Sequence, residues 1–313
     1  MKRDIVEFLI CPACLPEENR LHLRHADSAG GEILTGRIEC PNCGNSYPVA
    51  RGIARLVPPS AEHPPGPVER YERPDLLSAY IWSHYADLFE DPGATPAYDE
   101  WAEQLTCTSG FGLDAGCATG RFTFEMARKC EFAVGVDLSE NFISAARRLM
   151  NTRELIFYLR EEGNIQTEKT FKLPISWNSE NLEFIVADVQ ALPFRAGFFS
   201  QVASLNLLDK IPRPMEHLLE ANRVARAEGC RMLISDPFSW SEEVSPPENW
   251  LGGSRDGPFS GWGIENIAHL LSEGREGIGP PWEISRNGEV WWKIRNHRNH
   301  FELIRSQFIR AER

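Results

Sequence analysis

The sequence has no apolar run near the roughly 20 residues that a membrane-spanning helix requires. Its opening, Met1 to Asp4, leads into only a brief apolar run before a cysteine, so it lacks the pattern of a secretory signal. We therefore expect a cytoplasmic protein with no membrane contact. Cations are also in deficit, because 33 Lys and Arg stand against 45 Asp and Glu and the net charge is −12. This balance disfavours non-specific nucleic-acid binding, which needs surplus cations at the phosphates.

Charge is spread unevenly along the chain. Residues 286–313 hold seven Lys and Arg but three Glu. One interpretation is that these cations lie on the solvated faces of strands. The alternative is an edge that faces RNA or an anionic substrate.

The length of 313 residues allows one full α/β domain and a smaller one. Prolines crowd residues 58–67. Such a run favours extended backbone and cannot enter a helix interior. We therefore predict a Pro-rich linker over 59–70, which separates a small domain over 1–58 from a larger one over 71–313.

Past the linker, strand-length apolar runs alternate with helical patterns. The expected strands are 111–115, 132–137, 182–187, 198–205 and 231–235, and the expected helices are 74–89, 97–105, 122–129, 140–150 and 215–226. This alternation implies βαβ crossovers. It predicts an α/β fold with a doubly wound, mostly parallel, seven-stranded sheet.

The end of the chain breaks the alternation. Two strands, 282–295 and 301–311, are expected with no helix between them, and Asn287-Gly288 is a hairpin turn signal. We therefore predict an antiparallel C-terminal strand on the parallel sheet. Two further segments, 152–181 and 239–263, are longer than simple connections. We interpret them as insertions that cover a substrate.

Four cysteines near the start form two pairs, Cys11 with Cys14 and Cys40 with Cys43, and 25 residues separate the inner two. Two residues between thiolates let both reach one ion from a tight turn, and four sulfurs in a tetrahedron suit Zn²⁺. Because protein would fill every ligand position, this zinc would be structural. Disulfides are the alternative, which a cytoplasmic location disfavours.

The residues around these cysteines carry a resemblance. Residues 5–14 read IVEFLICPAC, and residues 39–56 read ECPNCGNSYPVARGIARL. Both stretches resemble the small zinc-ribbon activator proteins of tRNA, ribosomal RNA and protein methyltransferases. That resemblance implies a zinc ribbon that packs on the larger domain or on a partner protein.

The first expected strand of the larger domain leads into a glycine turn, DAGCATG over residues 114–120. The turn lacks the GxGxxG spacing of NAD sites and the Gly-Lys-Ser/Thr of phosphate loops. Gly116 and Gly120 would let a ligand approach the backbone closely. Asp114 could hold the ammonium group of that ligand.

Two further acids follow the next expected strands. Asp137 lies where an adenosine ribose presents its hydroxyls, and Asp188 could reach the adenine amino group. Since the carboxyl ends of parallel strands meet at one edge, the acids should converge there. Each acid alone could instead cap a helix.

Together these features resemble class I S-adenosylmethionine-dependent methyltransferases. Residues 188–194, which read DVQALPF, and residues 198–207 are similar to the subgroup that includes quinone-biosynthesis methyltransferases. The resemblance implies S-adenosyl-L-methionine as the cofactor. The cofactor contacts that it implies are Asp114, Gly116, Cys117, Gly120, Asp137, Leu138, Asp188, Val189 and Asn206.

Methyl transfer is an in-line displacement that positioning alone can accelerate strongly, so a general base is optional. The candidates for such a base or for cofactor packing are His84, Tyr85 and His297, each with a structural role as the alternative.

No Asn/Asp-Pro-Pro-aromatic motif follows the fourth strand, where Asn206 stands. In this superfamily that motif marks methylation of planar nitrogens. We therefore expect a small-molecule acceptor. The alternatives are an RNA methyltransferase that docks through its ribbon and a non-catalytic scaffold that binds the cofactor or a partner.

Overall fold

The structure, a computed structural model, describes residues 1–59, 61 and 71–313. Its N-terminal part holds two short 3-10 helices and four strands. Their bounds are η1 Arg3–Phe8, η2 Pro12–Cys14, β1 His22–Ala29, β2 Glu32–Glu39, β3 Ser46–Ala50 and β4 Ile53–Leu56. The predicted linker over 59–70 lies almost wholly outside the described residues. The linker and the domain boundaries on either side of it therefore stay predictions.

The larger part of the chain contains the predicted alternation of strands and helices. Its helices are α2 Pro74–Tyr85, η3 Ala86–Phe89, α3 Ala97–Ala102, α4 Arg121–Ala127, α5 Glu140–Thr152, η4 Leu208–Lys210, α6 Pro214–Val224, η5 Pro247–Asn249 and α7 Gly263–Glu273. Its strands are β5 Phe111–Ala115, β6 Phe132–Asp137, β7 Glu154–Glu162, β8 Ile165–Lys172, β9 Leu182–Ala187, β10 Phe199–Leu205, β11 Arg231–Asp236, β12 Glu283–His297 and β13 His300–Glu312. In the described part of the chain, no helix combines the length and apolarity that crossing a membrane requires.

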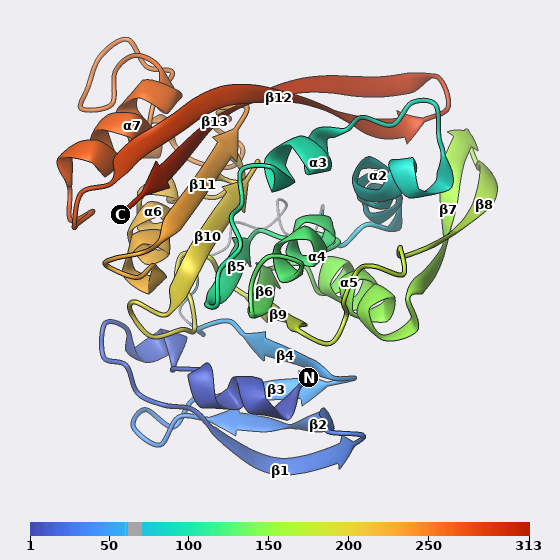
Figure 1. Ribbon diagram of the computed structural model, residues 1–313, viewed down its shortest axis with the longest axis horizontal. Helices are drawn as coiled ribbons and strands as arrows, with labels where there is room; N and C mark the ends of the chain where they lie inside the picture. The colour runs from blue at the N-terminus through green and yellow to red at the C-terminus, as the bar shows by residue number, and fades with distance from the viewer. Residues whose placement is uncertain (60, 62–70) are drawn as a thin grey trace.

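Seven strands of the larger part lie in the order β9-β6-β5-β10-β11-β13-β12 (Figure 1). The first five run parallel, and β13 is antiparallel to both of its neighbours. This confirms the predicted α/β sheet with an antiparallel C-terminal strand. The strand order reverses between β5 and β10, and such a switch point opens a crevice at the carboxyl ends of the strands.

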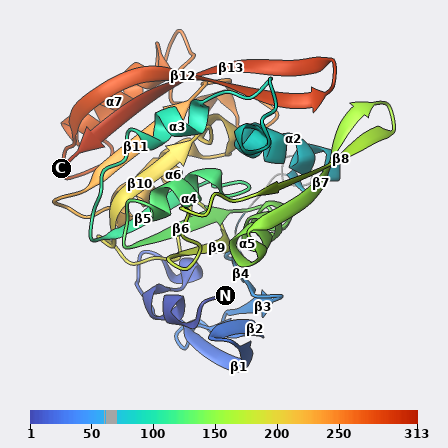
Figure 2. The same ribbon diagram turned by 45° about the vertical axis from the view of Figure 1, so that its right-hand side comes forward.

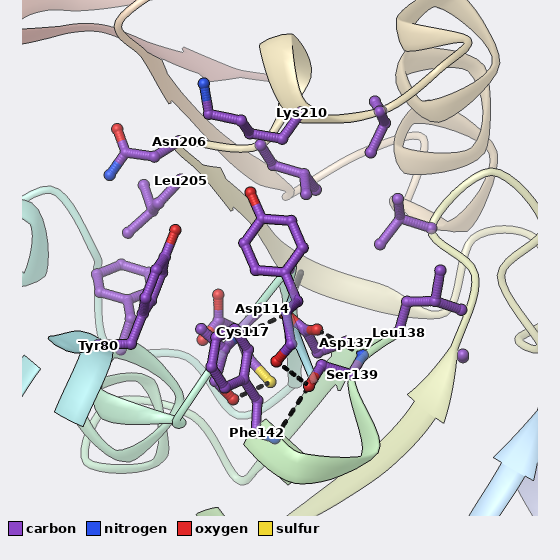
Figure 3. A pocket seen from close by; sticks show the side chains of 18 of the residues that line it. Tyr80, Asp114, Cys117, Asp137, Leu138, Ser139, Phe142, Leu205, Asn206 and Lys210 are labelled. Carbon is purple, nitrogen blue, oxygen red and sulfur yellow. Dashed lines mark hydrogen bonds between the residues drawn. The ribbon is translucent and has the colours of Figure 1, made fainter. Parts of the chain in front are cut away.

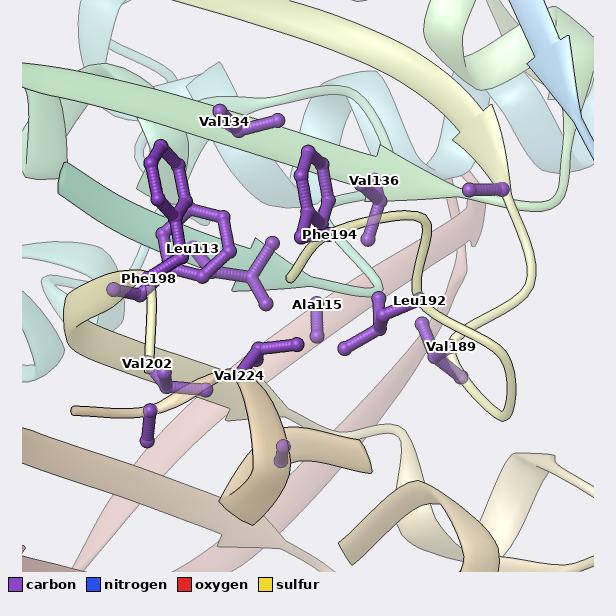
Figure 4. Packing of buried hydrophobic residues seen from close by; sticks show 14 of the residues in the cluster. Leu113, Ala115, Val134, Val136, Val189, Leu192, Phe194, Phe198, Val202 and Val224 are labelled. Carbon is purple, nitrogen blue, oxygen red and sulfur yellow. The ribbon is translucent and has the colours of Figure 1, made fainter. Parts of the chain in front are cut away.

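Helices cover both faces of this sheet, as Figure 2 shows. Because successive side chains of a strand point to opposite faces, each strand contributes to two cores. Val134 and Val136 of β6 pack in the cluster that α6 and α7 cover, and Figure 4 shows them there with Val224. Ala133 of the same strand lies in the cluster beneath α2 to α5. Two buried cores thus hold the central strands rigidly.

The N-terminal part extends the same sheet. β4 pairs in parallel with β9, and the backbone N–H of Ile10 donates to the carbonyl of Pro193 at 3.0 Å. Beside this seam, Arg147 of α5 forms ion pairs with Glu183 of β9 and with Glu32 of β2. The result is one eleven-stranded sheet with the ribbon at its β9 edge (Figure 1). Of the two positions expected for the ribbon, it therefore takes the one on the larger domain.

The turn predicted at Asn287-Gly288 is wrong. Both residues lie inside β12, opposite Ile309 and Phe308 of β13, and the chain reverses at residues 298–299 instead. A Cβ on Gly288 would lie 2.8 Å from the Phe308 ring, so this glycine lets the ring pack against the backbone. Close packing, rather than a turn, accounts for the glycine.

The segment 152–181 folds into a hairpin of its own. Strands β7 and β8 form a separate two-stranded sheet, and Phe171 of β8 stacks on Tyr85 of α2 with ring centroids 4.9 Å apart. The hairpin therefore braces the outside of α2.

Candidate functional site

The four cysteines of the ribbon converge. Their sulfur atoms all lie within 4.8 Å of one another, with Cys11 to Cys43 at 3.7 Å and Cys14 to Cys40 at 3.8 Å. Tetrahedral zinc with Zn–S bonds of about 2.3 Å requires sulfurs about 3.8 Å apart. The cluster therefore fits a structural zinc ion.

Neighbouring side chains support the sulfurs. The hydroxyl of Tyr47 lies 3.2 Å from the sulfur of Cys11, and the amide of Asn42 donates to Cys14 at 3.8 Å. Such contacts fix the direction of metal ligands and offset thiolate charge. Three of the four cysteines are buried, so the ion would sit inside the ribbon.

A pocket opens at the carboxyl ends of the central strands. It encloses about 1150 Å³, part of which is open to solvent. Eight of the nine predicted cofactor residues line it: Asp114, Gly116, Cys117, Asp137, Leu138, Asp188, Val189 and Asn206. Figure 3 labels five of these, namely Asp114, Cys117, Asp137, Leu138 and Asn206. The predicted cofactor residues thus come together from the ends of β5, β6, β9 and β10.

Gly120 is the exception. It caps the start of α4 with φ +87, and a Cβ there would lie 2.6 Å from the ring of Phe184. Its lack of a side chain therefore serves the close packing of helix on sheet. Gly116, with φ +80, does border the pocket, where a Cβ would meet Leu207 at 2.9 Å.

Asp137, at the end of β6, is held by one backbone donor at each of its carboxylate oxygens. The N–H of Ala118 donates to Oδ2 and the N–H of Ser139 donates to Oδ1, both at 2.9 Å. Burial nevertheless raises its pKa to about 6. A carboxylate fixed in this way keeps lone pairs available for two adjacent hydroxyls of a ligand.

Asp114, in β5, is the most deeply buried acid of the pocket, with 1% exposure. Its Oδ2 accepts a hydrogen bond from the hydroxyl of Thr123 at 2.7 Å. Burial raises its pKa to about 7. A cationic ligand would favour the ionised form, so this carboxyl fits an ammonium or sulfonium group.

Asp188 follows β9 and is also buried. Its Oδ1 accepts from the backbone N–H of Gln190 at 2.9 Å and from the side-chain amide of Gln190 at 3.2 Å. Leu138 and Val189 place apolar surface beside Asp137 and Asp188. Apolar walls with polar groups at their rims suit a nucleoside.

The three candidates for a base or for cofactor packing lie in different places in the structure. His84 lines the pocket, and its Nδ1 lies 2.9 Å from the hydroxyl of Thr119. Burial lowers the pKa of His84 to about 3, so this imidazole is neutral. Tyr85 lies behind the pocket wall, where its hydroxyl donates to the carbonyl of Thr119 at 2.8 Å. His297 lies at the far end of β12, beside His300.

Several pocket residues were not predicted. Tyr80 of α2, Tyr98 of α3, Phe142 of α5 and Trp292 of β12 add aromatic surface, and Lys210 of η4 adds a cation. The sequence does show Tyr80 on an amphipathic helix, but the position of Trp292 depends on the register of the terminal hairpin. Among the described residues, the 239–263 segment contributes Val244 and the 152–181 segment contributes none.

Two parts of the chain match protein families. Residues 113–233 match the family described as methyltransferase domain, and residues 2–52 match the family described as Trm112p-like protein. Over 85 residues the chain is 26% identical to the putative methyltransferase YqeM of Bacillus subtilis (strain 168). That match covers 26% of this chain and 34% of YqeM, so it spans about a third of the relative's length.

Solved structures with similar folds include two from archaea. One is the complex between the Haloferax volcanii Trm112 methyltransferase activator and the putative methyltransferase, at 13% identity and a TM-score of 0.47. It covers 81% of this chain and 100% of that chain. The other is a SAM-dependent methyltransferase from Methanosarcina mazei, at 18% identity, a TM-score of 0.42 and coverage of 66% and 92%. By its family matches, the chain contains a methyltransferase domain over residues 113–233 and a Trm112p-like domain over residues 2–52.

Proposed function

We propose that this protein transfers a methyl group from S-adenosylmethionine to a small-molecule acceptor. The observation that carries the proposal is the convergence of Asp114, Asp137 and Asp188 on one pocket at the switch point of the sheet. Each acid has a different environment, and each environment suits a different part of the cofactor.

Asp114, buried and with its pKa raised, is suited to the ammonium group of the cofactor. Asp137, fixed by two backbone N–H groups, is suited to the ribose hydroxyls. Asp188, which accepts from Gln190 and is followed by Val189, is suited to the adenine amino group. The nine-residue prediction thus becomes a proposed set of seven cofactor contacts, with Gly120 supporting the turn from behind and Asn206 at the opposite end of the pocket from Asp137.

When bound, S-adenosylmethionine supplies a methyl group on a positively charged sulfur. The chain's own contribution is to orient the two reactants and to exclude water. Correct positioning of the reactants can supply much of the rate enhancement. His84 is neutral, but its Nδ1 is engaged by Thr119. We therefore assign this histidine to holding the pocket wall rather than to proton transfer.

The ribbon has a structural role in this proposal. Its strand β4 covers the β9 edge, and β9 leads directly to Asp188. A zinc-held domain on that edge would keep the end of β9 in place. Loss of the ribbon would therefore weaken cofactor binding at a distance.

RNA methylation is the second candidate, because the Trm112p-like match gives the chain a domain that could dock a larger substrate. The C-terminal cations count against it, since five of the seven are engaged within the protein. Their partners are the Gly93 carbonyl for Lys293, Glu161 for Arg295, Glu289 for Arg305, Glu312 for Arg310, and Asn222 for Arg313. This pairing supports the solvated-strand interpretation over an RNA-facing edge.

Calorimetric titration with S-adenosylhomocysteine tests the proposal. The wild type should bind it, and Asp137→Asn should weaken binding at least tenfold, because hydrogen bonds to a charged group are lost. Asp256→Asn, at an exposed loop position, is the matched control and should leave binding intact. Absence of binding by the wild type would refute the proposal, and a salt-sensitive gel shift with tRNA or ribosomal RNA would favour the second candidate.

A further inference from the structure

A buried chain of hydrogen bonds runs from the C-terminal hairpin into the pocket. The indole N–H of Trp292 in β12 donates to the hydroxyl oxygen of Ser306 in β13 at 2.9 Å. The hydroxyl of Ser306 donates in turn to Oδ1 of Asn206, the residue that follows β10. Ser306 is fully buried and Trp292 is 5% exposed, so the chain of bonds is shielded from water.

Donor chemistry fixes the orientation of the Asn206 amide. An indole nitrogen can only donate, so Ser306 must accept from Trp292 and its own hydrogen remains to be given away. Asn206 is the one other partner of this hydroxyl among the described residues, so the atom that receives the hydrogen is the carbonyl oxygen of Asn206. The NH₂ group of Asn206 is thereby left for a ligand, and among the described residues nothing accepts a hydrogen bond from it.

The backbone of Asn206 is held as well. Its φ is +57, a left-handed conformation that asparagine tolerates better than most residues. Its N–H donates to the carbonyl of Ser235 in the neighbouring strand at 2.6 Å. Both the main chain and the amide are therefore fixed before any ligand arrives.

A second donor stands four residues further on. Lys210 is the one lysine or arginine among the described residues that line the pocket. Its ammonium lies 3.1 Å from Oδ1 of Asp209, whose Oδ2 accepts from the backbone N–H of Ser239 at 2.6 Å. Burial raises the pKa of Asp236, which accepts from the backbone N–H of Asp209, well above its usual value.

We propose that Asn206 and Lys210 form a donor pair that holds a carboxylate of the methyl acceptor, with Ser306 and Trp292 as positioning residues for Asn206. The proposal rests on the proposed methyl transfer. Figure 3 shows the pair at one end of the pocket and Asp137 and Ser139 at the other. The acids would thus serve the cofactor and the donors the acceptor.

The rest of the lining indicates the shape of this acceptor. Tyr80, Tyr98 and Trp292 line the same pocket as the donor pair, so aromatic side chains form part of its surface. A flat aromatic acid offers one face to such rings and its carboxylate to the donors. Benzoate is therefore a suitable probe, and benzamide is its neutral match in size and shape.

The test measures benzoate and benzamide binding to protein saturated with S-adenosylhomocysteine, by calorimetry. The wild type should prefer benzoate, and Asn206→Gly or Lys210→Met should reduce that preference about tenfold or more. Glycine is chosen at Asn206 because it keeps the positive φ without strain. A preference for benzoate that survives both substitutions would overturn the proposal.

The positioning role has its own readout. Ser306→Ala should reduce the preference for benzoate, and Trp292→Phe should reduce it less, because Ser306 can still donate to Asn206. The matched control is Ser285→Ala, a serine of the same hairpin on an exposed face, which should keep the preference. If Ser306 has a purely structural role, Ser306→Ala should lower the melting temperature and leave the preference for benzoate unchanged. That result would contradict the proposal.

Two further outcomes separate the sources of failure. If S-adenosylhomocysteine does not bind the wild type, both the proposed function and the donor pair are refuted. If the Asn206 and Lys210 variants lose affinity for S-adenosylhomocysteine relative to 5′-methylthioadenosine, which lacks the carboxylate, the pair serves the cofactor. That result would overturn the acceptor assignment and leave the proposed function standing.

Discussion

Affinity for S-adenosylhomocysteine should depend on pH through Asp114. Burial raises the pKa of this carboxyl to about 7, and an ammonium group can pair only with its ionised form. Lowering the pH through 7 protonates Asp114 in the free protein, so binding must then displace a proton. We therefore expect affinity to fall as the pH falls, in a range where an ordinary carboxyl would have no effect.

The size of the effect follows from that pKa. The ionised fraction of Asp114 drops from about nine tenths at pH 8 to about one tenth at pH 6, so affinity should weaken about tenfold, or about 1.4 kcal/mol. Burial raises the pKa of Asp137 to about 6, which steepens the loss below pH 6. Near pH 7, binding should release about half a proton from Asp114.

Calorimetric titration across this range gives both quantities. Repeating each titration in buffers with different ionisation enthalpies counts the protons released. Asp114→Asn should bind weakly, and between pH 8 and 6 it should keep only the roughly twofold loss that Asp137 contributes. An affinity that stays constant over that range in the wild type, or a tenfold loss that persists in Asp114→Asn, would refute the reasoning.

Ionisation of the same carboxyl should favour ligand binding but lower the stability of the ligand-free protein. The pKa of Asp114 in the folded state, about 7, lies above the usual aspartate value of 3.8, so its ionisation destabilises the fold. At low pH the neutral carboxyl carries no such cost, and the free energy of unfolding then falls as the pH rises from about 4 to about 7. The loss amounts to a few kcal/mol at most. Asp114→Asn should therefore melt higher than the wild type at pH 8 and bind less ligand. A lower melting temperature for the variant would contradict this.

Three other predictions concern the fold. The wild type should carry about one zinc per chain by mass spectrometry; Cys11→Ser should abolish this zinc and lower the melting temperature, whereas Cys107→Ser, at an exposed cysteine, should do neither. Arg147→Met leaves the buried carboxylate of Glu183 unpaired and should cost about 3–5 kcal/mol in urea unfolding; a cost under about 1 kcal/mol would contradict the ion pair. Gly288→Val forces a branched side chain against a ring and should cost roughly 1–3 kcal/mol in thermal unfolding, unless the register of the hairpin is different.

Local patterns predicted the central strands well. The strands expected at 111–115, 132–137 and 182–187 have the predicted bounds, because each is a short apolar run between polar turns. The acids at or just after their ends then fell at one edge, since parallel strands all point the same way. Neither inference needed any knowledge of distant contacts.

Predictions that depend on distant contacts fared worse. Asn287-Gly288 has the residues of a turn, but pairing along the whole of β12 overrode that local preference. Pairing of β4 with β9 uses backbone hydrogen bonds, which leave little trace in side-chain patterns. The aromatic wall at Trp292 likewise depends on how the terminal hairpin is set against the sheet. The depth at which Asp114 is buried, and so its pKa, could not be read from its place in the glycine turn.

Attachment of the ribbon to the β9 edge has a consequence for assembly. A separate small protein on that edge would leave it upon dilution, to an extent set by its concentration relative to its dissociation constant. Here the two partners share one chain, so the effective concentration of the ribbon at β9 is fixed by the tether and the stoichiometry is always one to one. The edge that would otherwise be open to other strands is also permanently occupied. The capacity of the larger domain to bind ligand should therefore be independent of protein concentration.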